Sequence, residues 1–270
     1  MSTIPRHVPA AGSAQWRGAV PRRVMQTFEG CDVPAGMWRA AASWRERNPQ
    51  YEYRFFDDAA RRQYLAEHFD RDVQRCYEAL PAGAFRADLW RYCALLVDGG
   101  VYADLDTVCR RPLGRLLAED DEFVVAHGKS RRMLFNAFVC CRPGHPFIRA
   151  TIDRAVALVL APDFPERLAA EPSFPFHVTG PGGLAAAVNI VLGRPIDTEF
   201  RVGRHDVAGV RFRILRKLHY RPLALRRVMD GLHTVLLCKY PGYDADLAAA
   251  KVVHWAKARS SVGRVQPLAE

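Results

Sequence analysis

The sequence lacks a long apolar run and an apolar leader at its start. The longest stretch without a charged residue, residues 172–193, is interrupted by prolines and a glycine pair, whereas a membrane-spanning helix needs about 20 apolar residues. Residues 1–20 contain no run of about 7–15 apolar residues, which a signal peptide requires. We therefore expect neither a transmembrane segment nor export, and we predict a cytoplasmic protein.

The sequence also lacks the cysteine pattern of a disulfide framework or a zinc site. Its seven cysteines are an odd number and include no Cys-x-x-Cys pair, whereas structural zinc sites use closely spaced ligand pairs. Cys140 and Cys141 are adjacent, and a bridge between neighbours is hard to form. We interpret the cysteines as small hydrophobic residues in a reducing compartment.

The composition is that of an ordinary globular protein, with 49% apolar and 25% charged residues among 270. This usage disfavours intrinsic disorder, collagen and coiled coil. Prolines and glycines interrupt any periodicity in residues 1–19, so we predict a flexible N-terminal tail there and a single domain over residues 20–270.

Strand-like and helical segments alternate along the chain, which favours an α/β layer fold with a mostly parallel central sheet. The predicted strands are residues 23–27, 51–56, 101–104, 123–126 and 135–141. The predicted helices are residues 37–47, 59–68, 84–98, 146–160 and 183–192. Residues 161–176 are rich in turn formers, and we expect an irregular connection there.

Positive charge is concentrated in one segment of a chain whose net charge is +10. Residues 201–230 contain nine Arg or Lys and two Asp, a density that attracts phosphate in nucleic acid, membranes or substrates. In residues 212–221 the apolar and basic side chains separate on a helical projection. We predict an interfacial helix, with peripheral contact to an anionic membrane from Arg211 to Arg227. The alternative is a solvated basic face over an ordinary core stripe.

The most informative motif is an acidic pair, Asp104 and Asp106, which follows Gly99 and Gly100. Side chains two residues apart in an extended segment point the same way, so both carboxylates can serve one site. Mg²⁺ or Mn²⁺ carried with a diphosphate binds through one or two carboxylates plus phosphate oxygens. The alternative for a bare Asp-x-Asp is an acidic turn on the surface.

The context of the acidic pair favours the site. Asp88 and Arg91 are spaced i,i+3 on the preceding predicted helix and project from one face, although a surface ion pair would look the same. The glycine pair permits a close approach of backbone to ligand. Residues 24–28 end the first predicted strand, at the carboxyl edge where α/β sheets bind ligands.

Four ordered motifs resemble the glycosyltransferases that contain a sugar-binding region with a DXD motif (family 32), a group that includes fungal Golgi mannosyltransferases and bacterial capsular-polysaccharide synthesis proteins. The clostridial glucosylating toxins share the same core. The motifs are residues 20–30, Trp44 with residues 48–51, residues 86–92, and residues 99–106. The resemblance covers roughly residues 20–136, with looser similarity at residues 179–181 and 254–255.

The resemblance implies a GT-A-type, Rossmann-like nucleotide-sugar-binding fold. It also implies a metal-dependent, retaining transfer of a hexose from a nucleoside-diphosphate sugar, with Mn²⁺ or Mg²⁺ as cofactor. The acceptor would be a saccharide or a polyprenyl-linked molecule, and the process would be surface polysaccharide synthesis. We expect the enzyme to work in the cytoplasm or at the inner face of the membrane.

The resemblance also implies roles for individual residues in metal and sugar binding. Asp106 would bind the metal directly, and Asp104 would contact the ribose or donor sugar and reach the metal through water. Asp88 and Arg91 would hold the donor sugar hydroxyls and the leaving oxygen. His254 would close the metal shell from the C-terminal end. The catalytic set is therefore Asp104, Asp106 and Arg91.

Further donor contacts follow from the same resemblance. Thr27 and Phe28 would lie against the nucleotide base, with Phe28 where the family usually has Trp. Asn136 would lie near the donor sugar, and Ser260 or Lys257 near the β-phosphate.

Two alternatives come from other functional classes. Residues 104–108 also fit the Asp-x-Asp-x-Val opening of haloacid-dehalogenase phosphohydrolases, with Asp104 as nucleophile, but that motif should follow a long apolar strand. A non-enzymatic nucleic-acid-binding protein could use the basic segment, but its few aromatics and the absence of a reading motif predict only nonspecific phosphate attraction, not specific nucleic-acid binding.

Overall fold

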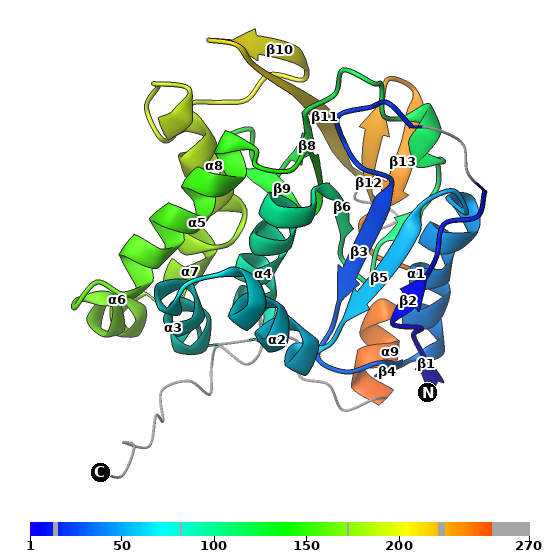
Figure 1. The fold of residues 1–270 in the computed structure, drawn as a ribbon, viewed down its shortest axis with the longest axis horizontal. Helices are drawn as coiled ribbons and strands as arrows, with labels where there is room; N and C mark the ends of the chain where they lie inside the picture. The colour runs from blue at the N-terminus through cyan, green and yellow to red at the C-terminus, as the bar shows by residue number, and fades with distance from the viewer. Residues whose placement is uncertain (13–15, 82, 172, 221–224, 250–270) are drawn as a thin grey trace.

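The computed structural model describes residues 1–12, 16–81, 83–171, 173–220 and 225–249. These residues form an α/β fold in which helices cover both faces of an eleven-stranded mixed sheet (Figure 1). The strand order is β2 (His7–Val8), β5 (Glu52–Phe56), β3 (Arg23–Thr27), β6 (Gly100–Ala103), β9 (Leu134–Cys141), β8 (Phe123–His127), β11 (Val210–Tyr220), β12 (Leu225–Asp230), β13 (His233–Leu237) and β7 (Val108–Cys109). The remaining strand, β10 (Gly203–Val207), pairs with β11.

The helices divide between the two faces of the sheet (Figure 1). On one face lie α2 (Asp58–His68), α3 (Arg71–Ala79), α4 (Gly83–Asp98), α5 (Pro146–Val159), α6 (Phe164–Ala170), α7 (Phe174–Val178) and α8 (Pro181–Val191). On the other lie α1 (Ala35–Arg47) and α9 (Tyr243–Ala249). Each face has its own apolar core, one around Trp90 of α4 and one around Trp44 of α1.

The pairing of the strands brings the carboxyl ends of several strands to one edge of the sheet. Strand β3 pairs in parallel with β5 and β6, and β8 pairs in parallel with β11. Strand β9 runs antiparallel between β6 and β8, so β6 and β8 point the same way. The ends of β3, β6, β8 and β11 therefore share the edge at which α/β sheets bind ligands.

Helix α4 and the glycines after it set the position of the acidic pair. Gly99 and Gly100 have φ angles of 61° and 102°, values that favour glycine. A Cβ on Gly100 would lie 2.8 Å from the carbonyl oxygen of Arg23, so the backbone of β6 approaches β3 more closely than a side chain would allow. The chain thus reverses from α4 directly into β6.

The predicted strands and helices all form, with bounds that differ by a few residues, and the predicted α/β fold class is confirmed. Two irregular regions were predicted wrongly. The first residues are not a loose tail, because β1 (Ser2–Thr3) pairs with β4 (Asp32–Val33), β2 pairs with β5, and Ile4 is buried. Residues 161–176 contain α6 and the start of α7, whose Phe164 and Phe174 pack against each other.

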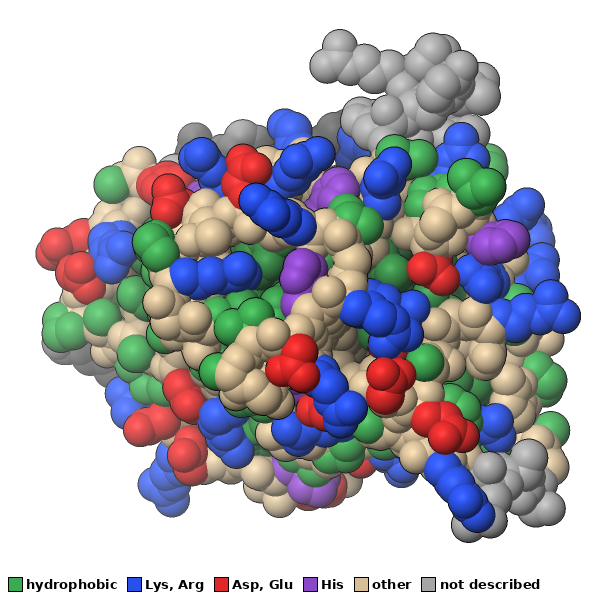
Figure 2. Space-filling model, turned by 90° about the horizontal axis from the view of Figure 1, so that it is seen from above, with side chains coloured by type: hydrophobic (Ala, Val, Ile, Leu, Met, Phe, Trp, Pro, Cys, Tyr) green, Lys and Arg blue, Asp and Glu red, His purple; other side chains and the backbone are tan. Residues whose placement is uncertain are grey.

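The predicted interfacial helix in the basic segment is also wrong, because residues 210–220 form strand β11. Arg213 is buried within this strand and pairs with Asp121 at 3.0 Å, which a helical projection could not anticipate. On the face seen from above, Lys and Arg side chains are interleaved with Asp and Glu (Figure 2). The predicted membrane contact therefore loses the amphipathic helix on which it depended.

Two smaller findings concern membranes and cysteines. Within the described part of the chain, no helix has the length and apolar character needed to cross a bilayer. All seven cysteines lie in that part and carry free thiols, six of them buried.

Candidate functional site

Three of the predicted site residues form a continuous chain of ion pairs beside the end of β6. Arg91 of α4 contacts Asp88 at 2.7 Å and Asp104 at 3.1 Å, and its guanidinium lies over the ring of Tyr102, 4.3 Å from the centroid. The Tyr102 hydroxyl donates to the same oxygen of Asp104 at 2.8 Å. Asp104 is therefore held in a fixed orientation, although a third of its side chain remains exposed.

Asn136, from the neighbouring strand β9, completes this network. Its side-chain amide donates to Asp88 at 2.9 Å, and its backbone carbonyl oxygen accepts from Arg91 at 2.7 Å. Burial raises the pKa of Asp88 to about 7, against the opposing effect of Arg91, while the negative charge of Asp104 adds to the rise. The predicted residues Asp88, Arg91, Asp104 and Asn136 thus belong to one buried polar unit. We call these four residues the Arg91 network.

Hydrogen bonds from side chains of two elements, β3 and α1, hold the turn after Asp104. Gln26 of β3 donates to the Asp104 carbonyl at 3.3 Å and accepts from the Tyr53 hydroxyl at 3.0 Å. The indole of Trp44 donates to the Thr107 carbonyl at 3.1 Å. These contacts fix the backbone on both sides of Asp106.

Asp106 differs from the rest of the site because its carboxylate makes no ion pair, and no hydrogen bond to another residue, among the described residues; its hydrogen-bond partner is its own backbone amide. Burial raises the pKa of Asp106 to about 7, and the charge of Asp104 adds to this rise while Lys239 opposes it. The backbone of Asp106 is anchored, since its carbonyl accepts from the Tyr240 amide at 3.0 Å. A fixed, partly buried carboxylate that pairs with no other described residue has the features of a ligand-binding group.

Three basic residues near the acidic pair were not singled out as site residues from the sequence. Lys239, after β13, lies 3.7 Å from the ring centroid of Tyr243, and Lys217 of β11 lies 3.5 Å from that of Phe135. Burial lowers the pKa of both lysines, and Asp104 opposes this for each. The charge of Arg226, on β12, acts on both lysines as well. The site therefore combines an acidic pair with cations that suit phosphate oxygens.

The sequence drew attention to only two of these three basic residues. The charge density of residues 201–230 includes Lys217 and Arg226, and we assigned it to a membrane instead. Nothing in the sequence around Lys239 marked it.

Thr27 and Phe28, predicted to contact the nucleotide base, lie at the end of β3. The parallel pairing of β3 with β6 ends at Met25 and Tyr102, and Gln26 donates to the Asp104 carbonyl, so Thr27 lies at the same edge of the sheet as Asp104. The Thr27 hydroxyl donates to the Phe56 carbonyl at 2.6 Å and accepts from Arg61 at 2.8 Å. It is therefore already engaged, and its ligand-binding role stays a prediction.

The remaining predicted residues, His254, Ser260 and Lys257, lie outside the described residues, as does Trp255. Among the residues that are described, no group of three or more His, Cys, Asp or Glu could hold a metal ion. Asp104 and Asp106 alone nevertheless fit a divalent ion that takes its other ligands from a diphosphate.

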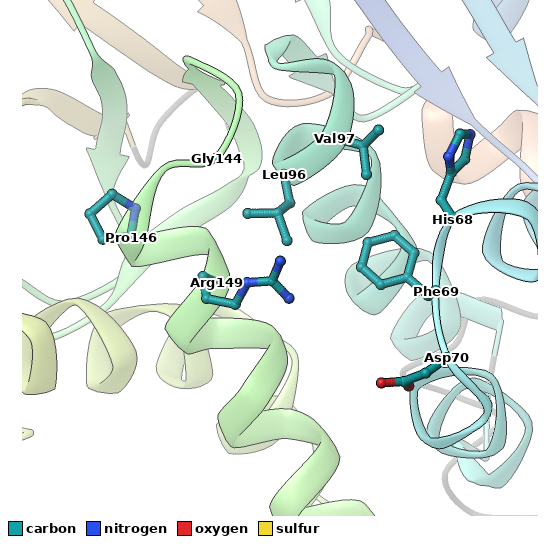
Figure 3. A pocket seen from close by; sticks show the side chains of 8 residues that line it. All are labelled: His68, Phe69, Asp70, Leu96, Val97, Gly144, Pro146 and Arg149. Carbon is teal, nitrogen blue, oxygen red and sulfur yellow. The ribbon is translucent and has the colours of Figure 1, made fainter.

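The cavity in Figure 3 has a volume of about 540 Å³ and lies elsewhere. It is lined by the last turn of α4, the start of α5 and the residues after α2, with Arg149 directed into it. Val97 is six residues beyond Arg91, which at about 1.5 Å per helical residue places the cavity some 9 Å along α4 from the Arg91 network. It contains neither member of the acidic pair.

Residues 34–123 match the family described as the glycosyltransferase sugar-binding region containing a DXD motif. The predicted family resemblance is confirmed for this segment. The segment contains the acidic pair together with Asp88 and Arg91, and Asn136 lies beyond its end.

Similar proteins include several fungal glycosyltransferases. A putative glycosyltransferase of Saccharomyces cerevisiae, HOC1, is 25% identical over 159 residues, 52% of this chain and 40% of that protein. An inositol phosphoceramide mannosyltransferase of Schizosaccharomyces pombe is 33% identical over 99 residues, 37% of this chain and 28% of that protein. The chain thus spans less than half the length of these curated relatives.

A solved structure named PaToxG Glycosyltransferase has the same fold. It superposes with a TM-score of 0.50 at 16% identity and covers 64% of this chain and 70% of its own. The predicted GT-A-type fold is confirmed by this likeness.

Proposed function

We propose that this protein transfers a hexose from a nucleoside-diphosphate sugar to a saccharide or lipid-linked acceptor. The observation that carries the proposal is the Asp106 carboxylate, which pairs with no other described residue, beside the Arg91 network and within a segment that matches the DXD glycosyltransferase region. Mannose is the first sugar to test, because the similar proteins include an inositol phosphoceramide mannosyltransferase of Schizosaccharomyces pombe and an initiation-specific alpha-1,6-mannosyltransferase of Candida albicans.

The site offers groups for each demand of this reaction. Asp106 and Asp104 would hold Mn²⁺ or Mg²⁺, which when bound neutralises charge on the departing diphosphate. Lys239 and Arg226 add fixed positive charge where the phosphates would lie. Asp88 and Asn136 keep Arg91 oriented towards the donor, so that the guanidinium does not reorganise during the reaction.

The finer features stay predictions. Retention of the anomeric configuration would have the departing phosphate oxygen take the proton of the acceptor hydroxyl on the same face. The cytoplasmic location and the role in surface polysaccharide synthesis also stay predictions. The family match across Asp104 and Asp106 favours glycosyl transfer over the phosphohydrolase alternative, and the ion pairs of β11 favour a structural role over nucleic-acid binding for that part of the basic segment.

A donor screen tests the proposal. The protein is incubated with Mn²⁺ and each common nucleotide sugar, and the released nucleoside diphosphate is measured. We expect one donor to be hydrolysed above the rest and EDTA to abolish the release. Release of phosphate from an aryl phosphate, without turnover of any nucleotide sugar, would support the phosphohydrolase instead.

A further inference from the structure

A second charged cavity lies where β8 ends, beside residues 216–218 of β11, and it differs from the acidic pair in having only basic charges. Its volume is about 430 Å³. It is lined by His127, Arg131, Arg201, Val202, Arg216, Lys217 and Leu218. No acidic residue is among these, although the chain contains 29 Asp and Glu. We call it the basic cavity.

The cations of the basic cavity have no acidic partners in the described part of the chain. Arg131, Arg201, Arg216 and Lys217 make no ion pair with any acidic residue that the structure describes. By contrast, Arg132, the next residue after Arg131, pairs with Glu199 at 3.7 Å. Like charges gathered without a counterion repel one another, so such an arrangement is stabilised by a bound anion.

His127 shows that these cations converge. Its Nε2 accepts from the Lys217 amide at 3.2 Å, and its Nδ1 faces the Gly128 carbonyl at 3.2 Å, so the ring joins the end of β8 to β11. Burial lowers the pKa of His127, and the charges of Lys217, Arg131 and Arg216 lower it further. The three cations therefore act on one point at the carboxyl edge of the sheet.

The basic cavity lies to one side of the acidic pair, away from β3. Strand order runs β3, β6, β9, β8, β11, and neighbouring strands are about 4.8 Å apart. The cavity is thus about 10–14 Å along the sheet from β6, on the side opposite to β3. Lys217 reaches back over Phe135 of β9 and is within range of the charge of Asp104, so it lies between the basic cavity and the candidate site.

We infer that the basic cavity binds a phosphate group carried by the acceptor. Arginine presents paired donors that match phosphate geometry. The assignment to the acceptor rests on the proposed function. In that reaction the bond from the anomeric carbon to the diphosphate oxygen breaks, the acceptor hydroxyl oxygen bonds to that carbon, and its proton leaves with the diphosphate. The acceptor phosphate is unchanged and serves as a handle.

The test is a titration with inorganic phosphate in EDTA, without donor, at constant pH and ionic strength. The NMR signal of the His127 ring, assigned from a His127→Gln variant, reports on the cavity. We expect a saturable shift with phosphate that chloride does not produce. The double variant Arg131→Gln/Arg216→Gln should weaken this binding at least tenfold, whereas the matched control Arg132→Gln should bind as the wild type does.

Two further experiments complete the test. One distinguishes a lipid phosphate from a soluble phosphate, and the other distinguishes failure of this inference from failure of the proposed function. Vesicles of phosphatidylcholine with phosphatidic acid should compete with phosphate if the handle is a lipid headgroup, and should not bind if it is a soluble phosphate. Asp106→Asn should keep the phosphate response, since this binding does not depend on the donor site. A His127 signal that phosphate leaves unmoved, or a response that survives in the double variant, would overturn the inference whether or not the protein turns over a donor.

Discussion

Two neighbouring parts of strand β11 carry similar basic side chains with different partners. At its start, Arg211 and Arg213 pair with Glu122 and Asp121, at 2.8 Å and 3.0 Å. Further along, Arg216 and Lys217 have no acidic partner among the described residues and line a cavity. Charge density in the sequence is the same in both parts, so only pairing in the structure separates cations that hold the fold from cations available to a ligand.

The same contrast separates two aspartates. Asp121 is buried, accepts from the Ala118 amide and pairs with Arg204 and Arg213. Asp106 has no such partner. We therefore expect substitutions of the paired group to affect stability and substitutions of the unpaired group to affect activity.

The largest effect on stability should come from Asp121→Asn. Removing one member of a buried pair leaves Arg213 with only one described ion pair, the weaker contact to Asp230 at 3.9 Å, and breaking a buried pair typically costs about 3–5 kcal/mol. The neighbouring Asp120→Asn is the matched control, because Asp120 is exposed and its loss should cost less than about 1 kcal/mol. Urea unfolding monitored by circular dichroism measures both variants. Equal stabilities for the two would contradict the distinction.

The largest effect on activity should come from Asp106→Asn. Loss of a group that stabilises charge in the transition state costs about 10²–10³-fold in turnover. Donor hydrolysis is the measurement, with Asp72→Asn, an exposed substitution on α3, as control. The variant should be at least as stable as the wild type, since it removes a buried charge that pairs with no other described residue. A folded variant with full turnover would rule out Asp106 as a metal ligand.

Besides the paired and unpaired charges, the protein buries a histidine, His145, that has a partner among the described residues for only one of its ring nitrogens. Its Nδ1 accepts from the Phe147 amide, while its Nε2 has no partner, and burial lowers the pKa of the ring to about 3. The unfolded chain takes up this proton below about pH 6.5 whereas the folded chain does not. Stability should therefore fall as the pH decreases from about 6.5 towards 3, by up to about 1.4 kcal/mol per pH unit.

His145→Asn keeps an N-cap for α5 and removes this proton. We expect the free energy of unfolding of the variant to depend less on pH between about 6.5 and 5 than that of the wild type. The exposed His233→Asn is the control and should follow the wild type. The explanation fails if His145→Asn has the wild-type pH dependence.

The smallest effect should come from Lys239→Gln. Losing one of several cations near a diphosphate should weaken nucleoside-diphosphate binding about tenfold, equal to about 1.4 kcal/mol. Isothermal titration calorimetry with Mn²⁺ present measures this, and the exposed Lys129→Gln should bind normally. A larger loss for Lys129→Gln would show that long-range charge outweighs position.

Much of this site could be predicted from sequence because its residues lie in local motifs. The i,i+3 spacing of Asp88 and Arg91, and the two-residue spacing of Asp104 and Asp106, place each pair on one face before any tertiary contact is known. Asn136 followed only from the family resemblance.

The cationic side of the site could not be predicted, because it depends on long-range pairing of strands. Lys217 lies on β11, Arg226 on β12 and Lys239 just after β13, and only the β11–β12–β13 register brings them near Asp104. An eleven-residue strand with buried Arg213 also breaks the simple alternation by which a strand is recognised. The helical interpretation of this segment failed for that reason.

The central claim is that the acidic pair binds a diphosphate through a divalent cation. Its most direct test is calorimetric titration of the wild type and of Asp106→Asn with a nucleoside diphosphate, each with Mn²⁺ and with EDTA. We predict tight binding only to the wild type with Mn²⁺. Binding of equal strength in EDTA, or in Asp106→Asn with Mn²⁺, would contradict the claim.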